Sequence, residues 1–540
     1  MKNIKIISCM ALILFISVFL GCVEKEPKLS QQRDDMTEQG MESEHGSQKI
    51  NSIDRNAAGL VNSEPSQIIE LPDGGVFQLE AKPVVKNING NIIRMLAYNG
   101  QIPGPLMKVK QGSSMYVNFT NKLDMETTVH WHGIRLENKY DGVADVTQNA
   151  VKAGESFLYK LDFPDDGIYW YHPHVRDDIG QELGLYGNIL VEPTKNYSPV
   201  DKEVALFLDD IKIEKGDVDL FSKNFARFAL TGRFGNIMLV NGETNYTLNV
   251  KKGEAVRFYL TNSANTRTFN SSIEGEKMKL VGGDSGRYEK ETFVDHVTLG
   301  IAERYIVEVL FEKSGTFAIL HTTPEKNYAI GKIIVSEDAS ESKKSSNFYM
   351  LKNNDDIVRE IAPFKKYITA KPDNELQLTI DMSMMDRSGM MDSGMMGSNT
   401  MDENQPVEPI EWEEDAEMAM MNSMSTSENV KWVIKDKATG KEKPRFKVKV
   451  GDAKKISLFN HPDSMHPMQH PIHLHGQRFL VLTQDGKNSD NLVWKDTVLV
   501  PAGRTIDILV EFSNPGEWLI HCHIPEHAEA GMIASFTVVR

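Results

Sequence analysis

The amino-acid sequence predicts an all-β protein of three consecutive β-sandwich domains, because two sequence elements each occur three times. The first alternates apolar and polar residues around a glycine turn, and its copies begin at Lys108, Asn249 and Lys447. The second follows each copy of the first and begins at Lys152, Gly300 and Pro501. Alternation with a period of two is typical of strands with one buried face, and helical periodicity is scarce. Three copies of one β-rich unit therefore predict three sandwiches.

The N-terminal segment predicts export. Two lysines precede the apolar run at 6–20, and Gly21 and Cys22 follow it. This pattern resembles a prokaryotic lipoprotein signal peptide over residues 1–22, cut before Cys22 so that the cysteine carries a lipid. The alternative is an uncleaved single-span anchor. Both interpretations place the protein in the cell envelope, in the periplasm or at the cell surface, and attach it to the membrane.

The rest of the chain divides by composition and by the repeats. Residues 23–66 are polar, with few aliphatic side chains, and predict a disordered tether. The three sandwiches are expected at 67–195, 196–345 and 346–540, and the third carries a methionine-rich insertion at 381–424. The net charge of -16 argues against nucleic acid as a partner, since phosphate binding needs a basic surface. We expect a monomer.

Four short motifs hold ten of the fifteen histidines. They are HWHG at 130–133, HPH at 172–174, HPIHLHG at 470–476 and HCHIPEH at 521–527. Residues i and i+2 of an extended strand point to the same side, so each motif presents a pair of imidazoles. The pairs are His130 with His132, His172 with His174, His473 with His475, and His521 with His523. Eight converging imidazoles are enough for three copper ions, each with two or three nitrogen ligands.

The cysteines indicate a second metal site. Cys9 lies within the signal and Cys22 would be acylated, which leaves Cys522 alone in an oxidising compartment. A lone exported cysteine between two histidines is best explained as a metal-bound thiolate. Because His521 and His523 point to one side of the strand, Cys522 must point to the other. One strand is therefore predicted to serve two metal sites, on its two faces.

Three further residues complete the cysteine site. His527 and Met532 follow Cys522 closely, and His470 comes from the preceding motif. One thiolate, two imidazoles and a weak axial thioether make the trigonal blue-copper arrangement. Zinc prefers four strong tetrahedral ligands, so the methionine favours copper.

These motifs, in this order, resemble the three-domain multicopper oxidases, the family of laccases, bacterial cuprous oxidases and ferroxidases. The resemblance covers residues 67–540 and implies cupredoxin-like Greek-key sandwiches with four copper ions. It implies that the type 1 copper is bound by Cys522, His470, His527 and Met532. It assigns type 2 copper to His130 and His473, one type 3 copper to His132, His172 and His523, and the other to His174, His475 and His521. The middle repeat has no such pairs, so we interpret it as a spacer in which His296 and His321 are structural.

The resemblance also implies a reaction. A substrate gives up single electrons at type 1 copper, Cys522 passes them on, and O2 is reduced to two waters by four electrons and four protons. Carboxylates near the cluster are the expected proton relays. Glu526 and Asp141 stand where family members carry an acid, although the Asp–Gly pair at 141–142 could be a simple turn.

The methionines indicate the substrate. Twelve of the 26 fall between 382 and 424, in a segment that is otherwise polar and that could alternatively be a loop without order. Thioethers are soft ligands that prefer Cu(I). Met468 lies two residues before His470, where the cuprous oxidases place a substrate methionine, and His466 stands where they usually carry an acid. The candidate Cu(I) ligands are Met468, His466, Met382, Met384, Met385, Met390, Met391, Met395 and Met396.

We therefore expect an enzyme that oxidises Cu(I) with O2 and serves copper detoxification. Laccase-like oxidation of phenols or aromatic amines is the alternative, followed by ferroxidase or manganese oxidation. A copper-sequestering surface protein without turnover is the alternative outside enzymes, but sequestration does not require converging histidine pairs.

Overall fold

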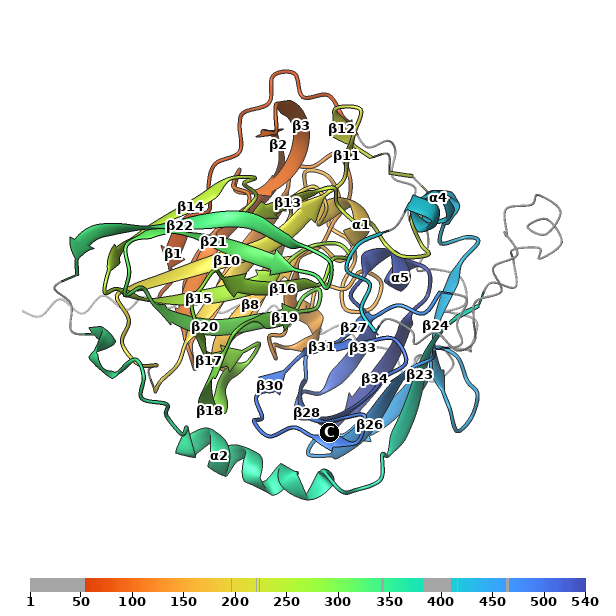
Figure 1. The fold of residues 1–540 in the computed structure, drawn as a ribbon. Coiled ribbons are helices and arrows are strands. Elements are labelled where there is room, and N and C mark those ends of the chain that lie inside the picture. The colour runs from red at the N-terminus through yellow and green to blue at the C-terminus, as the bar shows by residue number, and fades with distance from the viewer. Residues whose placement is uncertain are drawn as a thin grey trace, which may run out of the picture. The chain divides into compact units, whose positions relative to one another are not determined.

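The computed structural model describes residues 54–195, 197–219, 221–222, 224–340, 344–381, 409–414, 416–462 and 466–540 (Figure 1). The predicted signal peptide, most of the predicted tether and residues 382–408 of the insertion lie outside this part of the chain. Within it, no helix has both the length and the apolar character needed to cross a membrane.

The first sandwich contains two of the four histidine motifs. Its first sheet has the order β1 (Ile68–Glu70), β4 (Leu106–Lys110), β9 (Gly187–Glu192), β8 (Gly167–His172) and β6 (His130–His132). Its second sheet has the order β3 (Asn91–Tyr98), β2 (Gly75–Ile88), β5 (Ser114–Asn121) and β7 (Ser156–Asp162). Strand β5 follows the expected alternation, with Met115, Val117 and Phe119 buried and Tyr116 exposed.

The middle sandwich is built in the same way. Its first sheet has the order β13 (Ile237–Val240), β10 (Lys202–Ile211), β15 (Ala255–Asn262), β20 (Arg304–Leu310), β17 (Met278–Gly283) and β18 (Gly286–Val294). Its second sheet has the order β14 (Tyr246–Lys252), β22 (Asn327–Ala339), β21 (Gly315–Thr322), β16 (Phe269–Ile273) and β19 (Val297–Leu299). A short hairpin of β11 (Ile213–Glu214) and β12 (Asp217–Val218) stands apart from both.

The third sandwich holds the other two motifs. One sheet has the order β24 (Lys431–Asp436), β23 (Asn374–Asp381), β26 (Ala453–Asn460), β32 (Thr505–Glu511), β28 (Arg478–Gln484) and β29 (Lys487–Asn488), with β30 (Trp494–Lys495) also paired to β28. The other has the order β25 (Arg445–Lys449), β34 (Ile533–Val539), β33 (Gly516–Cys522), β27 (His470–Leu474) and β31 (Thr497–Val500). The predicted all-β fold of three sandwiches is confirmed.

The first repeated element carries the chain from one sheet of each sandwich to the other. Its strands are β4 and β5 in the first sandwich, β14 and β15 in the second, and β25 and β26 in the third. Gly112, Gly253 and Gly451 make the turns with φ between +85° and +93°, a conformation that glycine adopts without strain. The second element likewise places one strand in each sheet, and in the outer sandwiches its second strand ends at a histidine motif.

The few helices are short. They are η1 (Asn138–Tyr140), α1 (Asp177–Gly180), η2 (Lys344–Asn347), α2 (Asp355–Ile361), η3 (Ala362–Tyr367), α4 (Ala416–Met424) and α5 (Pro525–Glu529). The segment of η2, α2 and η3 connects the middle sandwich to the third (Figure 1). Helix α4 forms the end of the methionine-rich insertion, and α5 follows directly on the HCH sequence.

The buried cores show how the sandwiches combine. One continuous hydrophobic cluster includes Trp131 and Tyr171 of the first sandwich together with Ile472 and Trp518 of the third. The middle sandwich has a largely separate core around Phe258. The outer sandwiches therefore share an apolar interior although hundreds of residues separate them in sequence.

The predicted tether ends earlier than residue 66. Ser63 donates its backbone N–H to the carbonyl oxygen of Val85 at 2.8 Å, and Glu64 donates to that of Gly100 at 2.9 Å. Gln67 donates its backbone N–H to the side chain of Gln101. Composition alone suggested disorder here, but backbone pairing along the first sandwich orders these polar residues, which corrects the prediction for the last residues before 66.

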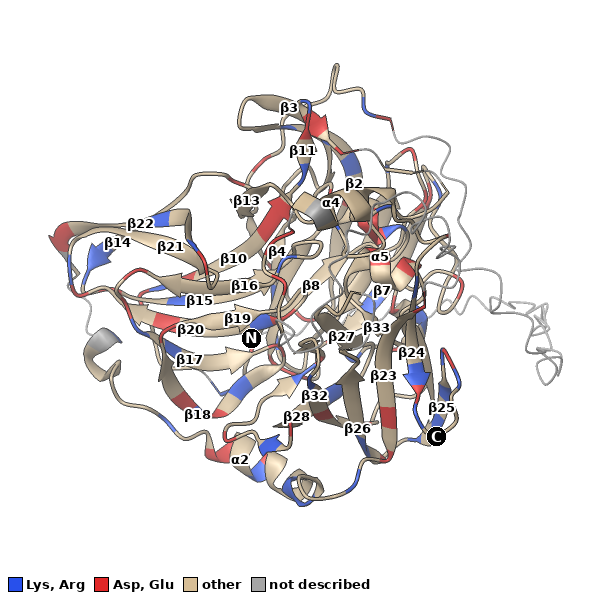
Figure 2. Ribbon diagram, turned by 45° about the vertical axis from the view of Figure 1, so that its right-hand side comes forward, with Lys and Arg blue, Asp and Glu red and all other residues tan. Residues whose placement is uncertain are grey.

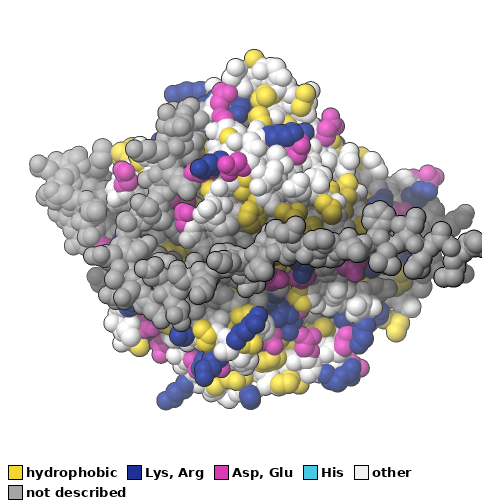
Figure 3. Space-filling model, turned by 180° about the vertical axis from the view of Figure 1, so that it is seen from behind, with side chains coloured by type: hydrophobic (Ala, Val, Ile, Leu, Met, Phe, Trp, Pro, Cys, Tyr) yellow, Lys and Arg dark blue, Asp and Glu magenta, His cyan; other side chains and the backbone are white. Residues whose placement is uncertain are grey.

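Charged residues of both signs are interspersed over all three sandwiches (Figure 2). Seen from behind, hydrophobic side chains of the described part are scattered among charged ones (Figure 3). Such scattering is normal for a protein surface.

Candidate metal centres

The four histidine pairs lie together at the contact between the first and third sandwiches. Within the first sandwich, His130 of β6 lies opposite His172 of β8. Within the third, His473 of β27 lies opposite His521 of β33. Across the contact, the rings of His132 and His473 stack with centroids 3.6 Å apart. The four histidine pairs thus converge in the structure.

Carbonyl and carboxylate oxygens orient the rings of this histidine cluster. The Nδ1–H of His130 donates to the carbonyl oxygen of Asp141 at 2.7 Å, and that of His475 donates to its carboxylate at 2.8 Å. The Nδ1–H of His473 donates to the carbonyl oxygen of Asp496 at 2.9 Å. Such bonds fix the tautomer and leave Nε2 free to bind a metal.

His132 has the opposite orientation. Its Nε2 lies 3.0 Å from the Asp496 carboxylate and 2.9 Å from the Thr497 hydroxyl, so its Nδ1 is the nitrogen that faces the cluster. Asp496 was missed by sequence reasoning, because a single aspartate at a strand edge has no distinctive spacing. Asp141 was predicted from the sequence, and it accepts hydrogen bonds from two histidines of the cluster, His130 and His475.

The donor set of the cluster fits metal ions. Seven buried imidazole nitrogens lack a hydrogen-bond partner among the described residues. They are Nε2 of His130, His172, His174 and His473, both nitrogens of His523, and Nδ1 of His132. Each buried unsatisfied polar group costs about 1–3 kcal/mol. Metal coordination would satisfy these nitrogens together, and three sets of three histidines have ligand atoms within 4.8 Å of one another.

The protonation of the cluster also suits metal binding. Burial, followed by the neighbouring imidazoles, lowers the pKa of His132, His172, His174, His473, His475 and His523 well below the usual value. Neutral imidazole is the form that binds metals, so these side chains are ready to bind at neutral pH.

The second centre lies on the other face of β33. The Cys522 Sγ is 3.7 Å from Nδ1 of His470 and 3.7 Å from Nδ1 of His527, and these two nitrogens are 3.3 Å apart. All three side chains are buried, and Trp432 packs on both imidazoles. Met532 is buried too, and its carbonyl oxygen accepts the backbone N–H of Cys522 at 3.1 Å. We call these residues the cysteine centre.

Glu526 lies on α5 between the two centres in sequence. It is fully buried, and burial raises the pKa of its carboxyl well above the usual value. Asn265 of the middle sandwich donates its side-chain amide to Oε1 at 3.2 Å. The other carboxyl oxygen has no hydrogen-bond partner within the described part of the chain.

The predicted substrate residues divide into three groups. Met468 is buried in the core beside the cysteine centre. His466 is partly exposed, and its Nε2 lies 2.9 Å from the carboxylate of Glu411. The backbone N–H and carbonyl oxygen of Glu411 form two hydrogen bonds with the side-chain amide of Gln469. Glu411 was not predicted. The seven methionines from 382 to 396 lie outside the described residues.

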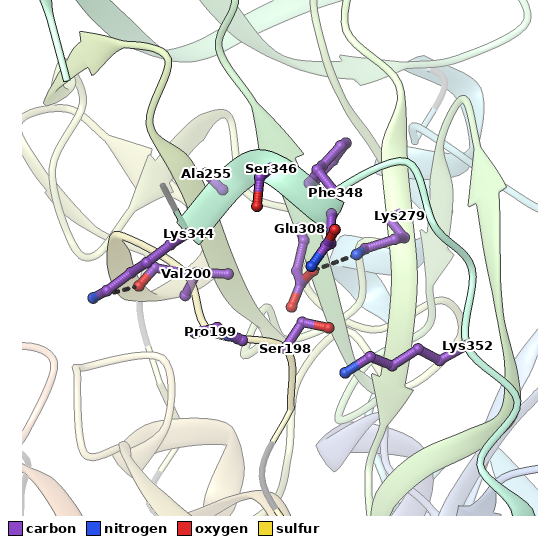
Figure 4. Close-up of a pocket in the computed structure, with 11 residues that line it drawn as sticks. Ser198, Pro199, Val200, Ala255, Lys279, Glu308, Lys344, Ser346, Phe348 and Lys352 are labelled. Atoms are coloured by element: carbon purple, nitrogen blue, oxygen red, sulfur yellow. Dashed lines mark hydrogen bonds and ion pairs between the residues drawn. The ribbon is translucent and has the colours of Figure 1, made fainter. Parts of the chain in front are cut away.

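The middle sandwich shows none of these arrangements in its described residues. Its buried His321 accepts the backbone N–H of Asn270 at 3.1 Å, which agrees with a structural role. A pocket of about 130 Å³ beside η2 is lined by Lys279 and Glu308, which form an ion pair of 2.8 Å, and by Phe348 (Figure 4). No predicted site residue lines this pocket.

Comparisons with known proteins agree with this arrangement. Three family profiles, each described as multicopper oxidase, match residues 82–196, 215–338 and 409–540, one in each sandwich. The multicopper oxidase MmcO of Mycobacterium tuberculosis is 28% identical, covering 88% of this chain and 90% of its own. Copper resistance protein A of Escherichia coli is 24% identical, with 86% and 93% covered. A laccase of Arthroderma benhamiae is 27% identical, with 87% and 80% covered.

Solved structures resemble the fold. A multi-copper oxidase from Pseudomonas thermotolerans is 26% identical with a TM-score of 0.63, covering 87% of this chain and 100% of its own. A multicopper oxidase from Campylobacter jejuni, titled a metallo-oxidase, is 23% identical with a TM-score of 0.66, covering 90% and 99%.

Proposed function

The chain belongs to the multicopper oxidase family, and on this premise we propose that it couples the oxidation of Cu(I) to the reduction of O2 to water. The observation that carries the proposal is the placement of two buried donor sets on the two faces of β33. Electron transfer at one face of the strand can thereby be connected to the reduction of O2 at the other face through a single residue, Cys522.

The cysteine centre is proposed to bind type 1 copper. Cys522, His470 and His527 supply three strong ligands whose atoms lie within 4.8 Å of one another, and Met532 would be the weak axial ligand. A thiolate with two imidazoles matches the trigonal blue-copper arrangement. The cysteine centre is buried, and Trp432 packs on both of its imidazoles. These features support a site that transfers electrons while its ligands stay in place.

The histidine cluster is proposed to bind the other three copper ions. His174, His475 and His521 form one compact set, which supports their assignment to one type 3 ion. The ring of His523 lies 5.0 Å from those of His132 and His172, which supports the second set. His130 and His473 remain for the type 2 ion, with ring centroids 5.7 Å apart.

The bound copper ions would supply one-electron redox chemistry at both sites. The backbone of β33 joins Cys522 directly to His521 and His523, so the path between the centres is only a few covalent bonds long. Glu526 can hold a proton at its buried carboxyl and release it toward the cluster. Asp141 accepts hydrogen bonds from His130 and His475 and so orients both rings beside the cluster.

Cu(I) is proposed as the electron donor because the sequence before the third histidine motif is rich in soft thioether ligands. The insertion brings twelve methionines between 382 and 424, and helix α4 presents exposed Met420 and Met424. The Glu411–His466 pair lies four residues from His470 in sequence and is partly exposed. One relative is named a copper resistance protein, which supports a role in copper tolerance.

We further propose that the protein is exported and held to the membrane through a lipid on Cys22, as its N-terminal sequence predicts. Laccase-like oxidation of phenols is the second candidate, favoured by the relative that is named a laccase.

The test is kcat/KM for Cu(I), Fe(II) and a small phenol on one copper-loaded preparation, with O2 uptake recorded. We expect the highest value for Cu(I) and the uptake of one O2 for every four Cu(I). Stoichiometric binding of Cu(I) without O2 consumption would contradict the oxidase proposal. A higher kcat/KM for the phenol would favour the laccase alternative.

A further inference from the structure

Arg304 extends from the middle sandwich to the histidine cluster. It begins β20 and is fully buried. Its guanidinium donates to the Asp496 carboxylate through two nitrogens, at 2.6 Å and 2.5 Å. Its Nε donates to the carbonyl oxygen of Ile168 in the first sandwich at 2.9 Å. One side chain of the middle sandwich thus contacts both outer sandwiches.

Asp496, the partner of Arg304, also contacts two histidines of the cluster. Its carboxylate lies 3.0 Å from Nε2 of His132, and its carbonyl oxygen accepts the Nδ1–H of His473 at 2.9 Å. A bidentate arginine–carboxylate pair has a fixed plane, unlike the single point contact of a lysine. Arg304 therefore determines how the Asp496 carboxylate faces His132.

The backbone packs closely around the Arg304–Asp496 pair. A Cβ atom on Gly133, the glycine of HWHG, would lie 2.2 Å from a carboxylate oxygen of Asp496 and 3.0 Å from the Arg304 guanidinium. Asp284 accepts the backbone N–H of Arg304 at 2.8 Å, which fixes the start of β20. Both side chains of the pair are fully buried, and Gly133 and Asp284 restrict where they can lie.

Stability alone does not explain such a pair. Burying two charges costs solvation that their attraction barely repays, and apolar residues of similar volume often serve a fold as well. An orienting role explains the geometry, since ligand tautomer and ring plane depend on the outer hydrogen bonds.

We propose that Arg304 is a positioning residue for the copper cluster, holding Asp496 so that His132 presents Nδ1 and His473 presents Nε2. This inference rests on the proposed assignment of both histidines as copper ligands. It gives the middle sandwich a part in O2 reduction beyond that of a spacer.

The test compares Arg304→Met with Arg257→Met in the full copper-loaded protein. Arg257 is a matched control, because it lies on the neighbouring strand β15, is 5% exposed and binds Glu308 through two nitrogens, at 3.0 Å and 2.6 Å. Removing Arg257 leaves Glu308 with Lys279 at 2.8 Å (Figure 4), whereas removing Arg304 leaves Asp496 with the hydroxyl of Thr497 at 2.9 Å. Glu308 forms its ion pairs with Arg257 and Lys279 within the middle sandwich, whereas the Asp496 carboxylate lies 3.0 Å from Nε2 of His132 in the histidine cluster.

The measurements are copper per chain, the blue absorption, the electron paramagnetic resonance spectrum of type 2 copper, and the rates of reduction by Cu(I) and reoxidation by O2. Arg304→Met should keep the blue absorption and fast reduction, lose at least one cluster copper or change the type 2 spectrum, and reoxidise about tenfold or more slowly. Arg257→Met should lower the melting temperature similarly but keep copper content, spectrum and reoxidation rate.

Arg304→Lys provides a second variant, which keeps the positive charge but loses the planar guanidinium that donates two hydrogen bonds to Asp496. It should shift the type 2 spectrum in the same direction as Arg304→Met, by a smaller amount. A wild-type spectrum and reoxidation rate in a folded Arg304→Met or Arg304→Lys protein would overturn the inference, as would an equal change in Arg257→Met. If the wild-type protein itself held copper only at the cysteine centre, the proposed function would fail instead.

Discussion

The two candidate metal centres occupy opposite faces of β33 but have different surroundings. The histidine cluster is shared between two sandwiches, and Asp141 and Asp496 form hydrogen bonds with its imidazole rings. The cysteine centre lies within the third sandwich, where no carboxylate of the described residues hydrogen-bonds Cys522, His470 or His527. Trp432 packs there instead.

This difference separates two tasks. Carboxylates beside the cluster set tautomers and can hold protons, which suits a reaction that consumes four protons with each O2. No carboxylate of the described residues hydrogen-bonds the ring nitrogens or the thiol of the cysteine centre, so electron transfer there is not directly coupled to a carboxylate proton. We infer that proton transfer takes place at the histidine cluster, on one face of β33. At the cysteine centre, on the other face, only electron transfer takes place.

Cys522→Ser should have the largest effect, because it removes the thiolate of one centre and the bridge between both. We expect the blue absorption at about 600 nm to disappear and turnover to fall to background. Absorption spectra and O2 uptake measure the two losses. The histidine cluster should keep its copper in this variant, and persistence of the blue colour would contradict the ligand assignment.

Glu526→Gln should slow proton delivery to the histidine cluster without slowing electron transfer into the cysteine centre. Burial raises the pKa of this carboxyl, which favours its protonated form, and glutamine copies its shape without its transferable proton. We expect stopped-flow reoxidation by O2 to slow by about 10²-fold while reduction of the cysteine centre stays fast.

Glu529→Gln on the same helix α5 is the control for this variant. Burial also raises the pKa of Glu529, to about 7, whereas the side-chain amide of Asn265 donates to Glu526. Its reoxidation rate should stay near that of the wild type. Unchanged turnover in Glu526→Gln would exclude this residue as the relay.

Deleting residues 382–408 should affect only the oxidation of Cu(I) at the cysteine centre. Residues from 411 onward are kept because Glu414 accepts hydrogen bonds from Thr231 and Asn422, and Glu411 pairs with His466. We expect kcat/KM for Cu(I) to fall by about tenfold, as lost soft ligands weaken capture of the ion. A small phenol serves as the control substrate, and an equal fall for both would mean that the segment is structural.

Proton release during copper loading gives the smallest expected effect. Burial raises the pKa of the Cys522 thiol, so the thiol is protonated at neutral pH and must lose its proton to bind copper. The lowered pKa values of the cluster imidazoles mean that they have no such proton to lose. Wild-type protein should therefore release about one proton more per chain than Cys522→Ser, measured by titration in weak buffer.

Much of the site was predictable because its geometry is local. The HxH pairs and the opposed direction of Cys522 follow from the period of a strand, which needs no knowledge of the rest of the chain. Asp141 and Glu526 were accessible through family resemblance. Arg304, Asp496 and Glu411 were not, since each is a single charged residue whose role depends on a partner more than 50 residues away.

The sequence by itself determined the β-sandwich units, the ligand types and the two faces of β33, because alternation, glycine turns and short motifs act over a few residues. Only the tertiary structure decided which imidazoles meet across the outer sandwiches, which nitrogen of His132 faces the cluster, and that the middle sandwich contributes Arg304. Those features depend on packing between distant segments, and strand periodicity carries no information about packing.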